Sequence, residues 1–173
     1  MIKCSPDSKR LLAKPWLWIL AVVISASVWG LCFYWASRVP VAQTLTVWVG
    51  ADAELDEKLK AEIIKTGEKY GIRKFDMTAY SPNDTYYAAA FALQSPTTDL
   101  FILEKTEAAT IAQTGVFKEL DGDRGERAVT YDGKVYGVIF AGDYCVLISA
   151  QSRKDAALLN DVFDAILSYG EGL

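Results

Sequence analysis

The sequence lacks several residue combinations that carry out catalysis in enzymes. The chain of 173 residues has no histidine, which excludes Ser–His and Cys–His nucleophile pairs and histidine-ligated metals. It has neither a Gly-rich P-loop nor a dinucleotide-binding G-x-G-x-x-G. Carboxylate pairs remain available, but none is marked by its spacing. We therefore expect a protein that is not an enzyme and uses no cofactor.

Two other sequence features resemble sites but are better interpreted as surface loops. Acidic residues alternate in DGDRGE, residues 121–126, as in a calcium-binding loop, but Gly125 stands where the fifth position needs Asp or Asn. The twelfth position is Asp132, which is shorter than the usual Glu and falls in a predicted turn. We therefore expect no metal site.

Residues 83–85 fit a glycosylation sequon, which matters only if the source organism modifies it.

Polar side chains gather at four places where predicted strands end, and the chemistry that they suggest is binding. In an open α/β sheet, ligands lie beyond the carboxyl ends of the strands. An aromatic ring there, such as Tyr80, can stack on a sugar or a cationic group. Tyr86 and Tyr87 follow it, and helical spacing favours core packing for one of them. The alternative is that Asp52 and Thr106 only cap helices and the other residues are solvated loop side chains. The four segments are 50–53, 80–83, 104–107 and 142–144.

Strands and helices alternate along the part of the chain that carries these segments. The apolar run LTVWVG, residues 45–50, predicts a buried strand, and the helix after it has Leu55, Leu59 and Ile63 on one face. Asp132-Gly133 predicts a hairpin. Repeated βαβ order predicts an α/β fold, a mostly parallel three-layer α/β/α sheet with an added hairpin. Further strands are expected at 74–80, 99–103 and 143–149, and further helices from residue 83 or 84, over 106–115 and over 154–172.

A transmembrane helix is predicted before this domain. Residues 16–35 are 20 residues without a charge, which span about 30 Å as a helix, the thickness of a bilayer core. Trp16 and Trp18 lie at one end of the run and Tyr34 and Trp35 at the other, as is typical of membrane interfaces. The run is longer than the roughly 7–15 apolar residues of a signal peptide, and Pro40 is unsuited to a cleavage site. We therefore expect an uncleaved anchor that holds the chain in the lipid bilayer.

Charged residues on the two sides of the span set its orientation. Four basic residues and one acidic residue precede it, and Arg38 stands alone just after it. Positive residues stay in the cytoplasm, so we expect a single-pass protein of the cell membrane with a cytoplasmic basic tail (1–15), a linker (36–43) and an extracytoplasmic α/β domain (44–173). Of the 18 basic and 22 acidic residues, 14 and 21 then lie outside, a net charge of −7. That charge disfavours nucleic acid and anionic membrane surfaces as partners.

The order of motifs resembles a known family over roughly residues 44–149. A first strand containing Trp48 and ending in Gly50 is followed by PTTDLFIL, by IAQTGVFKELD and by YDGKVYGV. This order resembles the first lobe of bacterial extracellular solute-binding proteins of the maltose-binding type. Members of that family hold their ligand between two lobes, and this chain resembles only one of them, truncated and attached to a membrane helix. The resemblance therefore implies the fold more directly than it implies ligand capture by domain closure.

The same resemblance implies where a ligand would bind. In that family the loops after the first and third strands contact the ligand, and the matched positions here are Asp52, Glu104 and Lys105. Asp143 and Tyr144 match positions near the crossover between the lobes. With Tyr80, these residues are the expected ligand-binding set, and a binding rim is expected to expose an edge of Trp48, Tyr80 or Tyr144.

The function expected from these features is that of a membrane-anchored, solute-binding-protein-like module. Its ligand is either a small solute or a partner protein, such as a transporter or another membrane protein. The alternative is a structural or interaction subunit of a membrane complex that binds no small ligand. Nucleic acid is not expected as a partner.

Overall fold

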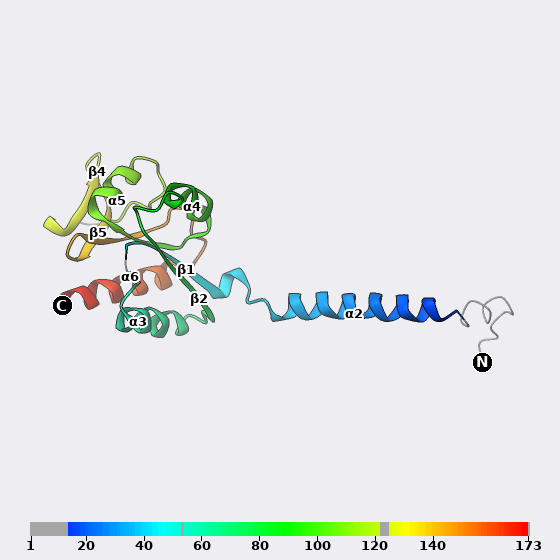
Figure 1. Cartoon of the computed structure of the whole chain (residues 1–173). Helices are drawn as coiled ribbons and strands as arrows, with labels where there is room; N and C mark the ends of the chain where they lie inside the picture. Colours follow the sequence, from blue (N-terminus) through cyan, green and yellow to red (C-terminus); the bar gives the residue numbers. More distant parts are fainter. Residues whose placement is uncertain (1–13, 53, 122–124, 173) are drawn as a thin grey trace. The chain divides into compact units, whose positions relative to one another are not determined.

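The structure is a computed structural model that describes residues 14–52, 54–121 and 125–172. Most of the expected cytoplasmic tail, Ala53 of the first polar segment and residues 122–124 of the DGDRGE loop lie outside the described residues. The chain divides into two compact units, residues 1–39 and residues 40–173 (Figure 1).

The first unit contains one long apolar helix. Helix α2, Pro15–Ser37, begins with a proline, which is favoured in the first turn because its missing N–H would have no helical partner there. None of its 23 residues is buried. Its length and composition fit a helix that crosses a membrane. The predicted apolar helix is therefore confirmed, and it has the character of a membrane anchor or a signal sequence.

The second unit is an α/β domain built on a six-stranded sheet with the order β2-β1-β3-β6-β5-β4. Strands β2, β1 and β3 are parallel, whereas β6, β5 and β4 are joined by antiparallel pairings. The antiparallel half follows from its tight turns, because a short hairpin can only reverse the chain. The α/β class is confirmed, and the sheet is a mixed one. The strands are β1 Thr44–Gly50, β2 Lys74–Tyr80, β3 Leu100–Glu104, β4 Ala128–Tyr131, β5 Lys134–Ala141 and β6 Tyr144–Ile148.

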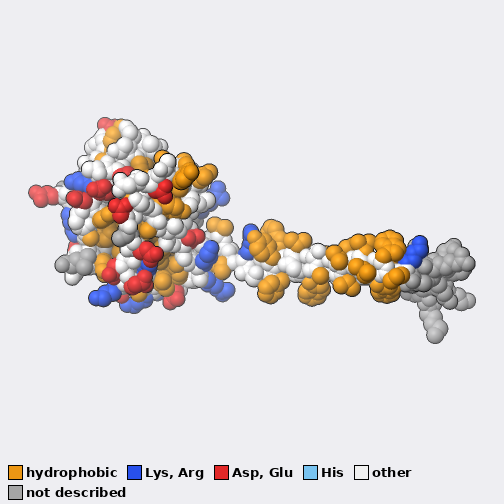
Figure 2. Space-filling model, viewed as in Figure 1, with side chains coloured by type: hydrophobic (Ala, Val, Ile, Leu, Met, Phe, Trp, Pro, Cys, Tyr) orange, Lys and Arg blue, Asp and Glu red, His pale blue; other side chains and the backbone are white. Residues whose placement is uncertain are grey.

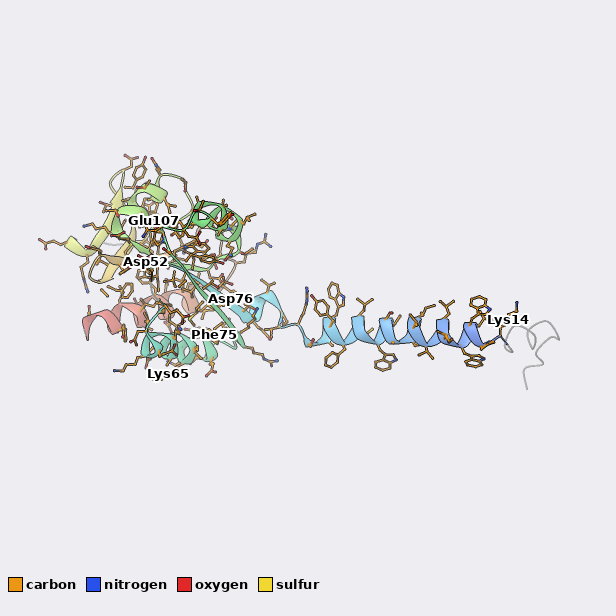
Figure 3. The ribbon with its side chains drawn as sticks, in the orientation of Figure 1. Lys14, Asp52, Lys65, Phe75, Asp76 and Glu107 are labelled. Carbon is orange, nitrogen blue, oxygen red and sulfur yellow. The ribbon has the colours of Figure 1, made fainter. Side chains whose placement is uncertain are left out.

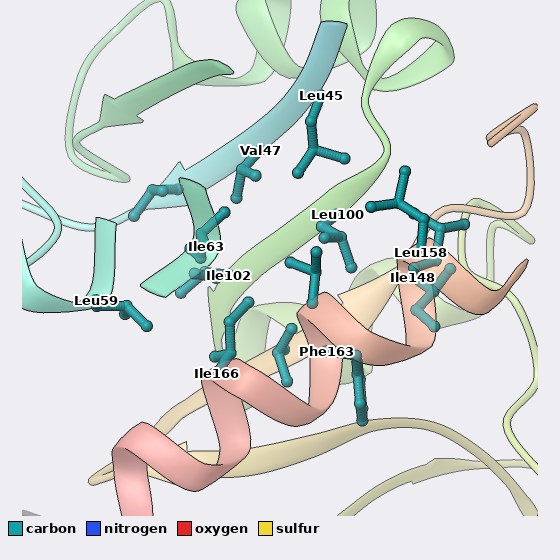
Figure 4. Close-up of a cluster of buried hydrophobic side chains, with 14 of the residues drawn as sticks. Leu45, Val47, Leu59, Ile63, Leu100, Ile102, Ile148, Leu158, Phe163 and Ile166 are labelled. Carbon is teal, nitrogen blue, oxygen red and sulfur yellow. The ribbon is translucent and has the colours of Figure 1, made fainter. Parts of the chain in front are cut away.

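Helices cover both faces of this sheet, which gives the three expected layers (Figure 1). Side chains alternate along β1, so Leu45, Val47 and Val49 point to one face and Trp48 to the other. On the first face they pack with Ile63 of α3 and residues of α6, such as Ile166 (Figure 4). On the second face, Trp48 packs with residues of α4 and α5. The helices are α3 Glu57–Glu68, α4 Tyr87–Gln94, α5 Lys105–Ala112 and α6 Ala156–Glu171, and the 3-10 turns are η1 Val41–Gln43, η2 Ser95–Thr97 and η3 Gly125–Arg127.

The helix starts differ from those that the sequence predicts. Asp52 was expected to cap the first helix of the domain, but α3 is capped by Asp56, whose carboxylate accepts a hydrogen bond from the Lys58 N–H at 2.7 Å. Helix α4 begins at Tyr87 rather than at residue 83 or 84, because residues 81–86 form turns that include a hydrogen bond from the Tyr86 N–H to the Asp84 carboxylate at 3.0 Å.

Thr106 is not the cap of α5, which begins at Lys105 directly after β3 and has no side-chain cap. The Lys105 N–H donates instead to the carbonyl of Asp143 at 2.8 Å. The hairpin beside the helix therefore satisfies a backbone donor that a capping side chain would otherwise have to satisfy.

Candidate binding rim

The predicted binding residues come together at one edge of the sheet. Because β1, β2 and β3 are parallel, their carboxyl ends meet there, and antiparallel β6 begins at the same edge. Gly50 pairs with Tyr80 across the β1–β2 ladder, and Glu104 pairs with Tyr144 across the β3–β6 ladder. We call this edge the rim and define it as residues 50–52, 80–81, 104–105 and 142–144. It contains all six residues of the expected set: Asp52, Tyr80, Glu104, Lys105, Asp143 and Tyr144.

Two contacts link the loops of the rim in pairs. The Ser81 hydroxyl donates to the carboxylate of Asp52, which joins the ends of β2 and β1. The Lys105 N–H donates to the Asp143 carbonyl at 2.8 Å, which joins β3 to the β5–β6 turn. Among the described residues, no group of three or more acidic or cysteine side chains is placed to hold a metal ion. The role of the six rim residues in binding stays a prediction, because a shared edge alone does not show that they contact a ligand.

An aromatic cluster supports the rim from within. The rings of Trp48 and Tyr80 are stacked, with centroids 4.1 Å apart and planes 11° apart. The rings of Tyr87 and Phe91 pack around the same indole, with their centroids 5.7 Å and 5.5 Å from that of Trp48. Trp48 is therefore only 1% exposed, and it cannot offer an edge to a ligand. Tyr80 is half-buried, and its hydroxyl lies 2.5 Å from the side-chain amide nitrogen of Gln94.

The exposed aromatic edge at the rim belongs to Tyr144, which is 37% exposed. Of the two tyrosines that open the second helix segment, Tyr87 packs inward and Tyr86 is 75% exposed. That division was expected from helical spacing. The rim thus presents Tyr144 directly to solvent, whereas Tyr80 is partly exposed and stacked on Trp48; a binding role for Tyr80 stays a prediction.

A buried polar contact beneath the rim escaped the sequence reasoning. Trp48 Nε1 donates to the Tyr87 hydroxyl at 3.4 Å, and Glu107 of α5 reaches the same place. A β-carbon at Gly50 would lie 2.8 Å from Leu103 Cδ2 and 3.2 Å from Glu107 Oε2, and it would also press on the Tyr87 hydroxyl. The absence of a side chain at Gly50 therefore lets Tyr87 and Glu107 approach the end of β1. Figure 3 shows Glu107 and Asp52 among the side chains of the domain.

The carboxyl group of Glu107 has an unusual electrostatic environment in this contact. Glu107 Oε2 is buried and accepts no hydrogen bond from the described residues. Burial, together with the charge of Glu104, raises the pKa of the Glu107 carboxyl, although the Tyr87 hydroxyl acts in the opposite direction. Burial and the nearby Glu107 also raise the pKa of Tyr87, so its hydroxyl stays protonated at neutral pH. The sequence signal for this pair was weak: a glycine at a strand end and an acid in the first turn of a helix.

A hollow of the domain lies away from the rim. A pocket of about 240 Å³ lies between the segment that follows α5 and one side of α6. Its lining mixes acidic, basic and apolar side chains, and the sequence pointed to no site there. The lining residues are Lys118, Glu119, Leu120, Asp121, Ile148, Asn160, Phe163 and Asp164.

Comparison with known proteins gives similarity of structure only. No protein-family model matches the chain, and no curated protein sequence matches it. The chain is similar to a cyclo/maltodextrin-binding protein complexed with maltotetraose, with 19% identity and a TM-score of 0.44 over 61% of this chain and 30% of that chain. For the maltose-binding periplasmic protein of Listeria monocytogenes in complex with maltose, the identity is 25% and the TM-score 0.40, over 57% of this chain and 27% of that chain.

An enzyme is also among the similar structures. Thiaminase I from Bacillus thiaminolyticus shares 19% identity at a TM-score of 0.38, over 54% of this chain and 27% of that chain. The chain thus spans no more than 30% of the length of these structures. The resemblance expected from the sequence is confirmed as a structural similarity to one lobe of maltose- and maltodextrin-binding extracellular solute-binding proteins.

Proposed function

We propose that the chain is a binding module held at the membrane by residues 16–35. Helix α2 is long, apolar and exposed along its length, which suits an anchor that stays in the bilayer. The basic residues before it favour a cytoplasmic N-terminus. Residues 36–43 are then a short linker, and residues 44–173 form an extracytoplasmic binding domain.

The rim is the surface that we assign to binding. Its exposed carboxylates, from Asp52, Glu104 and Asp143, outnumber its single cation, Lys105, so the favoured ligand carries positive charge. Tyr144 adds an exposed aromatic ring that can pack on an alkyl or cationic group. This gathering of exposed acids beside an aromatic ring on one edge of the sheet is the observation that carries the proposal.

The rim is one edge of a single domain, which favours a macromolecular ligand over a small one. Pockets for small molecules bury about 70–90% of the surface of their ligand, whereas an edge of one domain covers only one side of it. A basic segment of a transporter or another membrane protein needs only one face for contact. We therefore propose such a basic segment as the ligand of the rim, with a small cationic solute as the alternative ligand.

Thermal unfolding of the full chain in lipid nanodiscs tests this proposal. Basic peptides, polyamines and neutral sugars are added in turn, and a compound that binds the folded state raises the unfolding temperature. We expect cationic compounds to raise it and Glu104→Gln/Asp143→Asn to abolish the rise. The matched control is Glu68→Gln/Asp164→Asn, which removes two exposed acids outside the rim. No shift with any compound, or an equal shift in the rim variant, contradicts the proposal.

The alternative role, an interaction subunit that binds no small ligand, has support from a different surface. Helix α4 has no buried residue, and Tyr86 and Leu93 at its two ends are 75% and 80% exposed. Figure 2 shows hydrophobic side chains gathered over the position of α4. Exposed apolar patches of this kind are typical of contacts between proteins. For this role, Leu93→Glu should dissociate a complex purified from the source membrane, while Glu104→Gln/Asp143→Asn should leave it intact. The reverse result supports the rim.

A further inference from the structure

Charge is distributed unevenly along the strand direction of the domain. Acids dominate the rim, at the carboxyl ends of β1–β3. At the opposite ends of the strands lie Arg73, Lys74, Arg153 and Lys154, which we call the basic edge. Figure 2 shows basic side chains on the side of the domain where η1 lies. The net charge of −7 expected for the residues outside the membrane therefore conceals a local surplus of cations.

Contacts with the backbone place three of these residues around η1, and Arg153 directly precedes the third, Lys154. Thr44, which follows η1, pairs with Lys74 at the start of the β1–β2 ladder. The Arg73 N–H donates to the Gln43 carbonyl at 2.8 Å. From the other side, Lys154 Nζ donates to the Val41 carbonyl. Two cations thus stand on each side of the turn through which the chain enters the domain.

The acidic residues near the basic edge accept hydrogen bonds within the fold or lie at the limit of ion-pair distance from its cations. Asp99 is 5% exposed, accepts from the Thr46 N–H at 3.0 Å and accepts from the Ser152 hydroxyl at 2.6 Å. Asp155 caps α6 by accepting from the Ala157 N–H at 2.9 Å. Asp76 stands 3.9 Å from Lys74, at the limit of an ion pair.

The two arginines of the basic edge are open to an external anion. Arg73 and Arg153 are exposed, and neither makes an ion pair with a described residue. Ser152 is held by Asp99 at 2.6 Å, so the loop that carries Arg153 is fixed to the body of the domain. The arginines are therefore presented from a defined surface rather than from a free segment.

The linker between α2 and the basic edge is short. Three residues, 38–40, separate the last residue of α2 from Val41 of η1. At no more than about 3.5 Å per residue, the distance from Ser37 to Val41 is at most about 14 Å. Val41 is 84% exposed and lies among the cations as an apolar contact. An apolar side chain flanked by Lys and Arg is typical of surfaces that lie on lipid headgroups.

We propose that the basic edge docks on anionic lipid headgroups of the same bilayer that α2 crosses. This inference rests on the proposed role of α2 as an anchor. Seven residues of β1, about 20 Å, separate the basic edge from the acidic rim, and this distance exceeds the Debye length of about 8–10 Å at physiological salt. The headgroups therefore respond to the local cations and not to the net charge. Docking in this way turns the rim away from the membrane, toward a ligand.

Fluorescence quenching on the full chain tests the docking. Cys4 and Cys32 are replaced by serine, and a fluorophore is attached at Gln151→Cys, beside the basic edge, or at Asn83→Cys, beside the rim. The chain is placed in nanodiscs of neutral phosphatidylcholine, or with 30% phosphatidylglycerol, that contain a lipid with a nitroxide on its headgroup. We expect quenching of the probe at 151 to rise at least twofold in the anionic nanodiscs and to fall back in 0.5 M salt. Quenching of the probe at 83 should stay low in both.

Two variants separate specific docking from a general effect of charge. Arg73→Gln/Arg153→Gln should remove the rise at position 151, whereas Lys58→Gln/Arg127→Gln, an equal change of charge elsewhere on the surface, should preserve it. Equal quenching at 151 in neutral and anionic nanodiscs, or equal quenching at 83 and 151, overturns the docking while α2 remains an anchor. Release of the chain from membranes by alkaline carbonate overturns the anchor itself, and the docking with it.

Discussion

The indole ring of Trp48 lies flat against the phenol ring of Tyr80, with ring centroids 4.1 Å apart. This stack joins the end of β1 to the end of β2 at the rim. One face of Tyr80 is covered as a result, and its hydroxyl is already in contact with Gln94. We infer that Tyr80 holds the rim in shape, and that Tyr144 is its more exposed aromatic residue.

Replacing Tyr80 should lower stability more than replacing Tyr144. Tyr80→Ala removes a half-buried ring and its stack, so we expect a loss of about 2–3 kcal/mol in the free energy of unfolding. Tyr144→Ala, at an exposed site, should cost less than about 0.5 kcal/mol. Urea unfolding measures both through Trp48 fluorescence, after the other four tryptophans, all in α2, are changed to phenylalanine. Equal losses would show that the stack has no structural role.

Gly50 should tolerate no side chain. Gly50→Ala places a β-carbon 2.8 Å from Leu103 and against the Tyr87 hydroxyl, and we expect a loss of about 1–3 kcal/mol. The control Gly172→Ala adds a β-carbon 3.5 Å from its nearest neighbour, an ordinary contact. Adding Tyr87→Phe to Gly50→Ala should recover part of the loss, because it removes the hydroxyl oxygen that the β-carbon meets. A double variant as unstable as the sum of its parts would count against this contact.

Glu107 should make stability depend on pH in the opposite sense to most carboxylates. Its pKa is raised in the folded state, so the folded state binds more protons than the unfolded state as pH rises above the ordinary value of 4.5. Stability is therefore lost as pH rises through that window and then levels off above the folded-state pKa.

The variant Glu107→Gln isolates this effect. At pH 7.5 it should be more stable than the natural chain by about 1 kcal/mol, because a neutral side chain avoids the cost of burying the carboxylate, whose Oε2 accepts no hydrogen bond. At pH 4 the two chains should differ little. Glu119→Gln, at an exposed acid, is the control. A variant less stable than the natural chain at pH 7.5 would mean that the Glu107 charge is satisfied in the folded state.

Asp99 should stabilise the edge of the sheet opposite the rim. It joins β1 to the loop after β6 through the Thr46 N–H and the Ser152 hydroxyl. Asp99→Ala leaves both donors without an acceptor, and we expect a loss of about 3 kcal/mol. Asp99→Asn keeps one acceptor oxygen and should cost less. The exposed Asp164→Ala provides the baseline, and a loss for Asp99→Ala no larger than this baseline would contradict the assigned role.

The sequence predicted those elements whose signals are local. LTVWVG alternates between the two faces of the sheet and became β1. Asp132 and Gly133 both adopt positive φ angles, 49° and 73°, as the hairpin signal requires. The helix starts were wrong where a distant residue replaces a local cap. Asp52 contacts Ser81 rather than a helix, and the Lys105 N–H finds Asp143.

The rim could be predicted from local sequence signals, whereas the Glu107 contact and the basic edge could not. The rim could be located from strand ends, since parallel strands place their carboxyl ends together. The contact of Glu107 with Gly50 depends on how closely α5 approaches β1, which no local pattern reports. Arg73 and Arg153 are 80 positions apart in the sequence. Only the pairing of β2 with β1, and the return of β6 beside β3, bring them to one edge.

Site-specific photo-crosslinking in the source membrane tests most directly whether the rim binds a ligand. A photoreactive phenylalanine replaces Tyr144 at the rim or, as a control of similar exposure, Tyr131 at the far end of β4, which are 37% and 42% exposed. We predict adducts from position 144 and not from position 131, with those at 144 lost when Glu104→Gln/Asp143→Asn is added. Mass spectrometry identifies the attached solute or protein. No adduct at 144, or equal adducts at both positions, would contradict a binding role for the rim.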